Sequence, residues 1–191
     1  MRHNIAFSLE RAAQNYPNRT AVVVPHTGTS ISFSELNDES SRIASGLNQY
    51  GLKNGDRVLL LVPFSIKFIS IAFALFKARA VPVLIDPGLG KKNILKCIEE
   101  VEPHGIISTP IVYAMSHIFR KSFRSVRRRV TVGSRWLWGG KTLEDIHNMA
   151  EPRPTYFNVL PNDPAAVLFT SGSTGSPKGV LYTHRMFSQQ L

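Results

Sequence analysis

The chain has 191 residues, of which 43% are hydrophobic and 19% charged, a composition typical of a globular protein with one sizeable core. Its single cysteine, Cys97, excludes an internal disulfide and favours a reducing compartment. The first residues lack a sustained apolar run, and charged residues interrupt the most apolar region, 58–85. We therefore expect neither a signal peptide nor a membrane span, and a cytoplasmic location.

Helices and strands are expected to alternate along the first 108 residues. The pattern predicts a helix with Asn4 at its N-cap and Pro17 after its end, and then strands at 21–24 and 30–33. A second helix is expected to begin with Ser34 as its cap and to end at Gly51. The remaining expected elements are a strand at 57–62, a helix at about 65–78, a strand at 81–85, a helix carrying Ile94, Ile98 and Val101, and a strand at 105–108.

The segment 57–85 reads as a strand, a buried helix and a second strand. Such a βαβ unit implies that the two strands are parallel. Because the alternation continues through residue 108, the predicted fold class is α/β.

A basic segment follows at 119–130, where the apolar residues recur at helical spacing and predict a basic amphipathic helix. Such a helix could pack its apolar stripe onto the protein's own core, or it could make a peripheral contact with an anionic membrane. We favour the first interpretation. No nucleic-acid partner is predicted, because no binding fold or base-stacking pattern accompanies the charge. The basic residues are Arg120, Lys121, Arg124, Arg127, Arg128 and Arg129, and the chain as a whole has a net charge of +10.

The most informative segment begins where a predicted strand at 165–169 ends. It reads Thr-Ser-Gly-Ser-Thr-Gly-Ser-Pro-Lys-Gly from residue 170. Closely spaced glycines let a backbone approach a ligand, while N–H groups, hydroxyls and a lysine converge on an anion. A polyphosphate site is therefore predicted, and its residues are Thr170, Ser171, Gly172, Ser173, Thr174, Gly175 and Lys178.

Two common phosphate-binding motifs are absent from this segment. Lys178 follows Pro177 and precedes Gly179, which does not fit the Walker pattern, and no G-x-G-x-x-G sequence is complete. A plain Gly/Ser linker is the alternative, but linkers are normally longer than this segment. The apolar residues on both sides argue against a linker.

The segment resembles the phosphate-binding signature of the AMP-forming acyl-adenylate synthetase superfamily. Similarity extends along the chain through Gly55-Asp56-Arg57-Val58 and the segment 76–87. A glycine usually stands in that family where this chain has Arg79, so a positive φ there would strain the helix end. The segments 86–93 and 135–140 resemble a bacterial subgroup that acts on fatty acids and includes the olefin-pathway β-lactone synthetases.

The resemblance implies that residues 1–191 form a partial N-terminal large domain that stops just after the phosphate loop, with the C-terminal domain absent. It implies a ligase that uses ATP and Mg²⁺ to convert a carboxylic acid, here a fatty acid, to an acyl-adenylate. Coenzyme A is one candidate for the second nucleophile. No catalytic residue and no protein ligand of a metal is assigned within the chain. His184, which follows Thr183 at a helix start, is expected to be structural rather than a base.

The groups that bind adenine and ribose in that family lie downstream of the phosphate loop, so we expect the 191 residues alone to be inactive. Two other interpretations remain open. The chain could be a non-catalytic remnant, or a basic module that binds membranes or nucleic acids.

Overall fold

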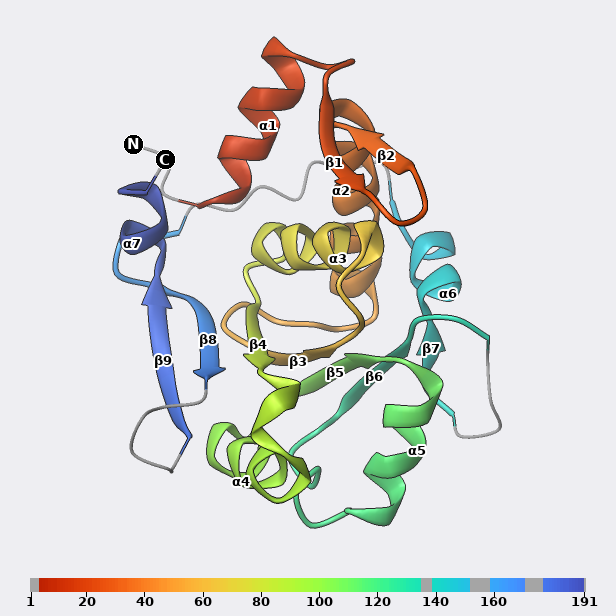
Figure 1. Ribbon diagram of the computed structural model, residues 1–191, viewed down its shortest axis with the longest axis vertical. Helices are drawn as coiled ribbons and strands as arrows, with labels where there is room; N and C mark the ends of the chain where they lie inside the picture. The colour runs from red at the N-terminus through yellow and green to blue at the C-terminus, as the bar shows by residue number, and fades with distance from the viewer. Residues whose placement is uncertain (1–3, 135–138, 152–158, 171–176, 191) are drawn as a thin grey trace.

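A single seven-stranded sheet organises most of the chain (Figure 1). The computed structural model describes residues 4–134, 139–151, 159–170 and 177–190. Every pair of neighbouring strands in this sheet is parallel except the last pair, β8 and β9. In spatial order the strands are β7 (Lys141–Thr142), β6 (Arg128–Thr131), β5 (Gly105–Ser108), β3 (Arg57–Leu61), β4 (Val81–Ile85), β8 (Pro164–Thr170) and β9 (Lys178–Thr183).

Helices cover both faces of the sheet. One face packs against α2 (Phe33–Gln49), α3 (Ile66–Lys77) and α6 (Leu143–Asn148). The other packs against α4 (Lys91–Val101) and against α5 (Pro110–Ile118) with the turn after it. Successive residues of β3 enter opposite cores, as a pleated strand requires: Val58 and Leu60 join the first core, and Leu59 joins the second.

The predicted α/β class and its βαβ unit are confirmed. Strands β3 and β4 are parallel and are joined through α3, and β4 has the predicted bounds. A 3-10 turn, η1 (Pro87–Leu89), then leads from β4 into α4. No helix among the described residues has the length and apolar character needed to cross a membrane.

The N-terminal region adds α1 (Ala6–Asn15) and a separate antiparallel hairpin of β1 (Thr20–Val24) and β2 (Thr29–Ser32). The prediction that Ser34 caps the following helix is wrong, because Ser32 is the cap. The Ser32 side chain accepts from Glu35 N at 3.3 Å, and Glu35 returns the bond by accepting from Ser32 N at 2.9 Å. A glutamate three residues after a serine permits this reciprocal arrangement, and Ser34 lacks such a partner.

The predicted basic helix at 119–130 is also wrong. Helix α5 ends at Ile118, turns follow, and residues 128–131 form β6. The apolar residues are buried as expected, with Phe123 in one core and Val130 in the other. Two of the arginines donate hydrogen bonds to residues far away in the sequence, and these contacts are compatible with an extended β6. The Arg128 Nε donates to Tyr50 O at 2.8 Å, and an Arg129 nitrogen donates to Ser116 Oγ at 2.7 Å.

Candidate functional site

The predicted phosphate loop connects two paired strands at one end of the sheet. Strand β8 ends at Thr170, β9 begins at Lys178, and these two residues are direct partners in the antiparallel register. Both are exposed. The five other predicted phosphate-binding residues, Ser171, Gly172, Ser173, Thr174 and Gly175, lie outside the described residues. The structure thus brings together the two ends of the loop.

Strand β8 places Thr170 at the carboxyl edge of the parallel sheet. It runs parallel to β4 with Ile85 opposite Phe169, and Asp86 N donates to Phe169 O at 3.0 Å. Parallel α/β sheets bind their ligands outside the carboxyl ends of their strands. The hairpin is therefore positioned where this class of fold presents a ligand site.

Gly179 has a role in this hairpin that the sequence did not reveal. A β-carbon at this position would lie 2.8 Å from the ring of Phe169, its partner in the register. Real β-carbons do not approach so closely, so a side chain at residue 179 would displace either the ring or the strand. The Pro-Lys-Gly sequence indicated that a glycine stands at residue 179, but the reason for it, the Phe169 ring, lies on the opposite strand.

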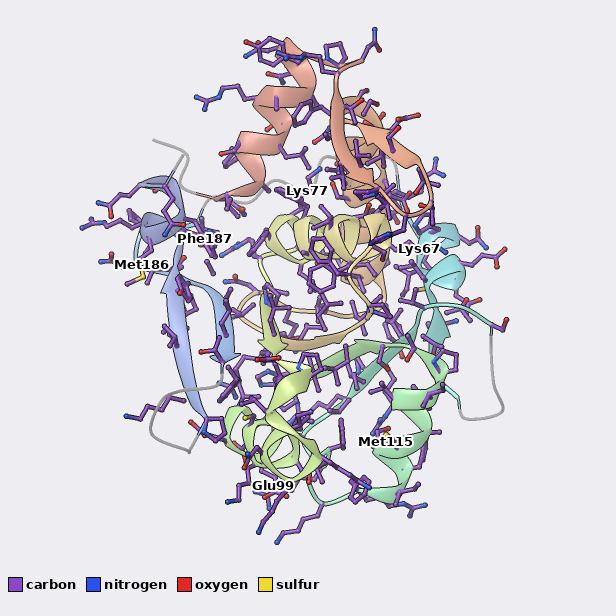
Figure 2. The ribbon with its side chains drawn as sticks, viewed as in Figure 1. Lys67, Lys77, Glu99, Met115, Met186 and Phe187 are labelled. Atoms are coloured by element: carbon purple, nitrogen blue, oxygen red, sulfur yellow. The ribbon has the colours of Figure 1, made fainter. Side chains whose placement is uncertain are left out.

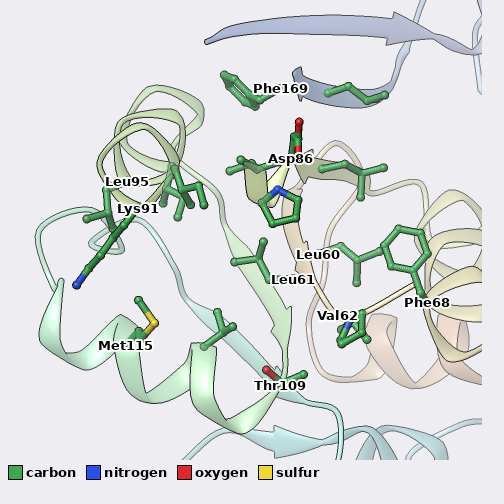
Figure 3. Close-up of a pocket in the computed structure, with 18 of the residues that line it drawn as sticks. Leu60, Leu61, Val62, Phe68, Asp86, Lys91, Leu95, Thr109, Met115 and Phe169 are labelled. Atoms are coloured by element: carbon green, nitrogen blue, oxygen red, sulfur yellow. The ribbon is translucent and has the colours of Figure 1, made fainter. Parts of the chain in front are cut away.

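An apolar cavity of about 730 Å³ lies beside the hairpin at the same edge of the sheet (Figure 3). Thr170 and Phe169 both line it, and Met115 of α5 lies on the side away from Phe169. The lining side chains are mostly apolar; they include Leu61, Leu84, Ile94, Ile98, Val112 and Phe119. No local sequence pattern predicts this cavity, because its walls come from three strands and three helices.

Two titratable groups close to these elements, His184 and Cys97, are buried. His184 is 3% exposed, begins α7 (His184–Ser188) and lies edge-on to Phe76 with 6.5 Å between ring centres. This agrees with the expected structural role. Cys97 is fully buried, and burial raises the pKa of its thiol, which makes it a poor nucleophile.

Comparison with known proteins shows the family of this chain. The sequence profile of AMP-binding enzymes matches residues 9–191. The chain belongs to the AMP-binding enzyme family. It is 39% identical to an olefin β-lactone synthetase of Xanthomonas campestris pv. campestris, over 98% of this chain and 35% of that protein. It is 28% identical to the long-chain fatty-acid–CoA ligase FadD13 of Mycobacterium tuberculosis, over 95% and 35%.

Solved structures give the same result for the fold. The N-terminal domain of FACL13 from Mycobacterium tuberculosis superposes with a TM-score of 0.81 at 26% identity, covering 96% of this chain and 45% of that one. The anthranilate CoA ligase AuaEII superposes with a TM-score of 0.81 at 22% identity, covering 96% and 35%. The chain has the fold of part of the N-terminal large domain of these AMP-binding enzymes and spans about a third of the length of the curated relatives it matches.

Proposed function

We propose that this chain is the N-terminal part of an ATP-dependent, AMP-forming ligase that activates a fatty acid as its acyl-adenylate. One observation carries the proposal: the phosphate-loop hairpin and the apolar cavity meet at Thr170. A polyphosphate at the loop and a hydrocarbon chain in the cavity would therefore be neighbours. Family membership and the olefin β-lactone synthetase and fatty-acid ligase relatives support the same assignment.

The proposed first step forms one phosphorus–oxygen bond and breaks another. A carboxylate oxygen of the fatty acid attacks the α-phosphate of ATP, and pyrophosphate leaves with the bonding electrons. Negative charge builds on the leaving group, so donors fixed around it stabilise the transition state. Lys178, Thr170 and the loop between them would supply these donors. Mg²⁺, when bound, would neutralise phosphate oxygens with few protein ligands.

The lining of the cavity supports an aliphatic acid as the substrate. Burying a methylene group is worth about 0.8 kcal/mol, which is about fourfold in affinity. Polar groups along the chain of a substrate would add no affinity, because the side chains that line this cavity are mostly apolar. In a second step the acyl group would pass to a nucleophile, for which coenzyme A is the first candidate because FadD13 and AuaEII are both named as CoA ligases.

The test is the affinity of the purified protein for saturated fatty acids of increasing length, measured by displacement of a fluorescent fatty acid. Affinity is expected to rise about fourfold per methylene until the cavity is full. In Met115→Trp the affinity should stop rising at a shorter chain length, because Met115 lines the cavity and the larger side chain would fill part of it. Ile118→Trp on the exposed side of the same helix is the matched control. Affinity independent of chain length, or equal effects of the two variants, would overturn the proposal.

A further inference from the structure

Helix α5 is apolar on its outer side as well as its inner side. Val112 and Met115 line the cavity on its inner side. Ile111 and Ile118 are two helical turns apart and so share a face, and they are 69% and 74% exposed. Water contact with two large aliphatic side chains on so short a helix gives no stability to the fold.

Basic side chains surround the exposed end of this helix. Ile118 lines one shallow hollow together with Lys92 and Lys96 of α4 and with Arg120 and Lys121 of the following turn. All four cations are exposed. Helices α4 and α5 lie together at the lower end of the molecule in Figure 1, away from α1 and the β1–β2 hairpin.

The acidic residues near this hollow do not cancel the charge. Glu99 is the one carboxylate that lines it, and Glu99 accepts a hydrogen bond from Ser122 Oγ at 2.7 Å. The Arg124 side chain, beside the hollow, is paired with Glu102 at 3.2 Å. Among the residues that line the hollow, four Lys and Arg side chains therefore face one carboxylate.

We propose that this surface, formed by the outer side of α5, the turn at 119–124 and the first half of α4, docks onto an anionic lipid membrane. Ile111 and Ile118 would enter the interface between headgroups and acyl chains. Lys92, Lys96, Arg120 and Lys121 would lie against lipid phosphates. The proposal differs from the expected amphipathic helix at 119–130, because the apolar anchors are on α5 and the cations come from two separate elements.

Charge complementarity favours a membrane over a protein or nucleic-acid partner. Four flexible cations on two elements match a fluid layer of phosphates, which needs no fixed register. The residues that dominate protein interfaces are enriched in aromatic side chains at the centre of the contact, and single-stranded nucleic acid binds where exposed aromatic rings stack on its bases. The aromatic side chain in this hollow, Phe119, is partly buried in the second core with Lys91 Nζ 4.4 Å from its ring centre.

Two weak signals must act together for stable attachment. Two isoleucines alone bury too little surface, and four cations alone give an attraction that salt screens. Each cation near an anionic surface contributes roughly fivefold to partitioning. Removal of either signal should therefore detach the protein, and removal of three cations should lower partitioning by about a hundredfold.

The experiment is flotation of the purified protein with vesicles of neutral phosphatidylcholine or of phosphatidylcholine with roughly 30% phosphatidylglycerol. We expect binding to the anionic vesicles alone, weakening as salt rises. The triple variant Lys92→Gln/Lys96→Gln/Lys121→Gln and the double variant Ile111→Ser/Ile118→Ser should each lose it. The matched controls change exposed residues elsewhere: Arg11→Gln/Lys53→Gln/Lys67→Gln removes equal charge, and Val23→Ser/Leu160→Ser removes comparable apolar exposure. These controls should bind as the unchanged protein does.

A direct readout locates the contact. An environment-sensitive dye on Ile118→Cys should shift to the blue when anionic vesicles are added, and the same dye on Val23→Cys should not shift. The native Cys97 is fully buried, so labelling is selective for the introduced thiol. Equal binding to neutral vesicles, equal loss in the charge control, or equal dye shifts at both positions would overturn the proposal.

Discussion

Lys77, which is only 1% exposed, donates a hydrogen bond from Nζ to the main-chain oxygen of Asn37 at 2.7 Å (Figure 2). The same nitrogen donates to Asn37 Oδ1 and to Ser41 Oγ, each at 2.8 Å. Helix α2 thus supplies three acceptors to a cation on α3. Burial lowers the pKa of Lys77 from 10.5 to about 8, against the opposing effect of the Glu10 and Asp38 charges.

This shift predicts a pH dependence of stability. Between about pH 8 and pH 10.5 the unfolded chain holds a proton on Lys77 that the folded chain has released. The free energy of unfolding therefore gains up to about 1.4 kcal/mol per pH unit from this group as the pH rises through that window. Lys77→Met removes the group, so the free energy of unfolding of the wild type relative to this variant should increase with pH.

Urea unfolding at about pH 7 and pH 10 measures this difference, and differences between variants cancel the titration of other groups. Lys67→Met, at an exposed position of the same helix, is the control and should show no such trend. A constant difference between wild type and Lys77→Met over the window would contradict the assigned pKa.

Gly46 marks the closest approach of two helices. A β-carbon there would overlap the main-chain oxygen of Ile146 in α6. Gly46→Ala should destabilise the protein by about 2 kcal/mol or more, although alanine is the better helix former by about 1 kcal/mol. Thermal or urea unfolding measures the loss. Arg42→Ala, exposed on the same helix, should be nearly neutral. A Gly46→Ala protein as stable as the wild type would show that α6 can move away freely.

Arg79 occupies a backbone position that suits glycine. Its φ is +59°, and Gly55 N donates to Arg79 O at 2.8 Å, which helps to fix this conformation between α3 and β4. The positive φ that the family's usual glycine would permit is thus present at Arg79. Arg79→Gly should be more stable than Arg79→Ala by roughly 1 kcal/mol, since both variants lose the guanidinium but only glycine relieves the strain. Calorimetric unfolding of the pair checks this. Equal stability would show that the left-handed conformation carries no cost here.

The sequence predicted the central part of the fold well because its signals are local. Residues 81–85 read as a continuous β-rich run, which is typical of a strand buried on both faces of a parallel sheet. The segment 119–130 failed because Phe119, Phe123, Val126 and Val130 fit a helical period by coincidence. The contacts that fit its extended form come from residues far away in the sequence: the acceptor for Arg128 is Tyr50, directly after α2, and the acceptor for Arg129 is Ser116 on α5.

The candidate site likewise has one part that local sequence predicts and two features that it does not. The loop between Thr170 and Lys178 was predictable because its glycines and hydroxyls are contiguous in sequence. The requirement for Gly179 depends on Phe169, ten residues away and opposite in the register, so only the pairing reveals it. The cavity depends on side chains from β3, β4, β8 and three helices, and no local pattern reports such an assembly.

The most direct test of the account is calorimetric binding of pyrophosphate to the purified protein and to variants at Lys178. The central claim is that the hairpin between Thr170 and Lys178 holds a polyphosphate. Losing one charged hydrogen bond should weaken binding by about ten- to a hundredfold in Lys178→Ala, with partial recovery in Lys178→Arg because the guanidinium keeps the charge but not the shape. Lys53→Ala, exposed and on another loop, should bind as the wild type does. Pyrophosphate binding that is unchanged in Lys178→Ala, or reduced equally in Lys53→Ala, would contradict the claim.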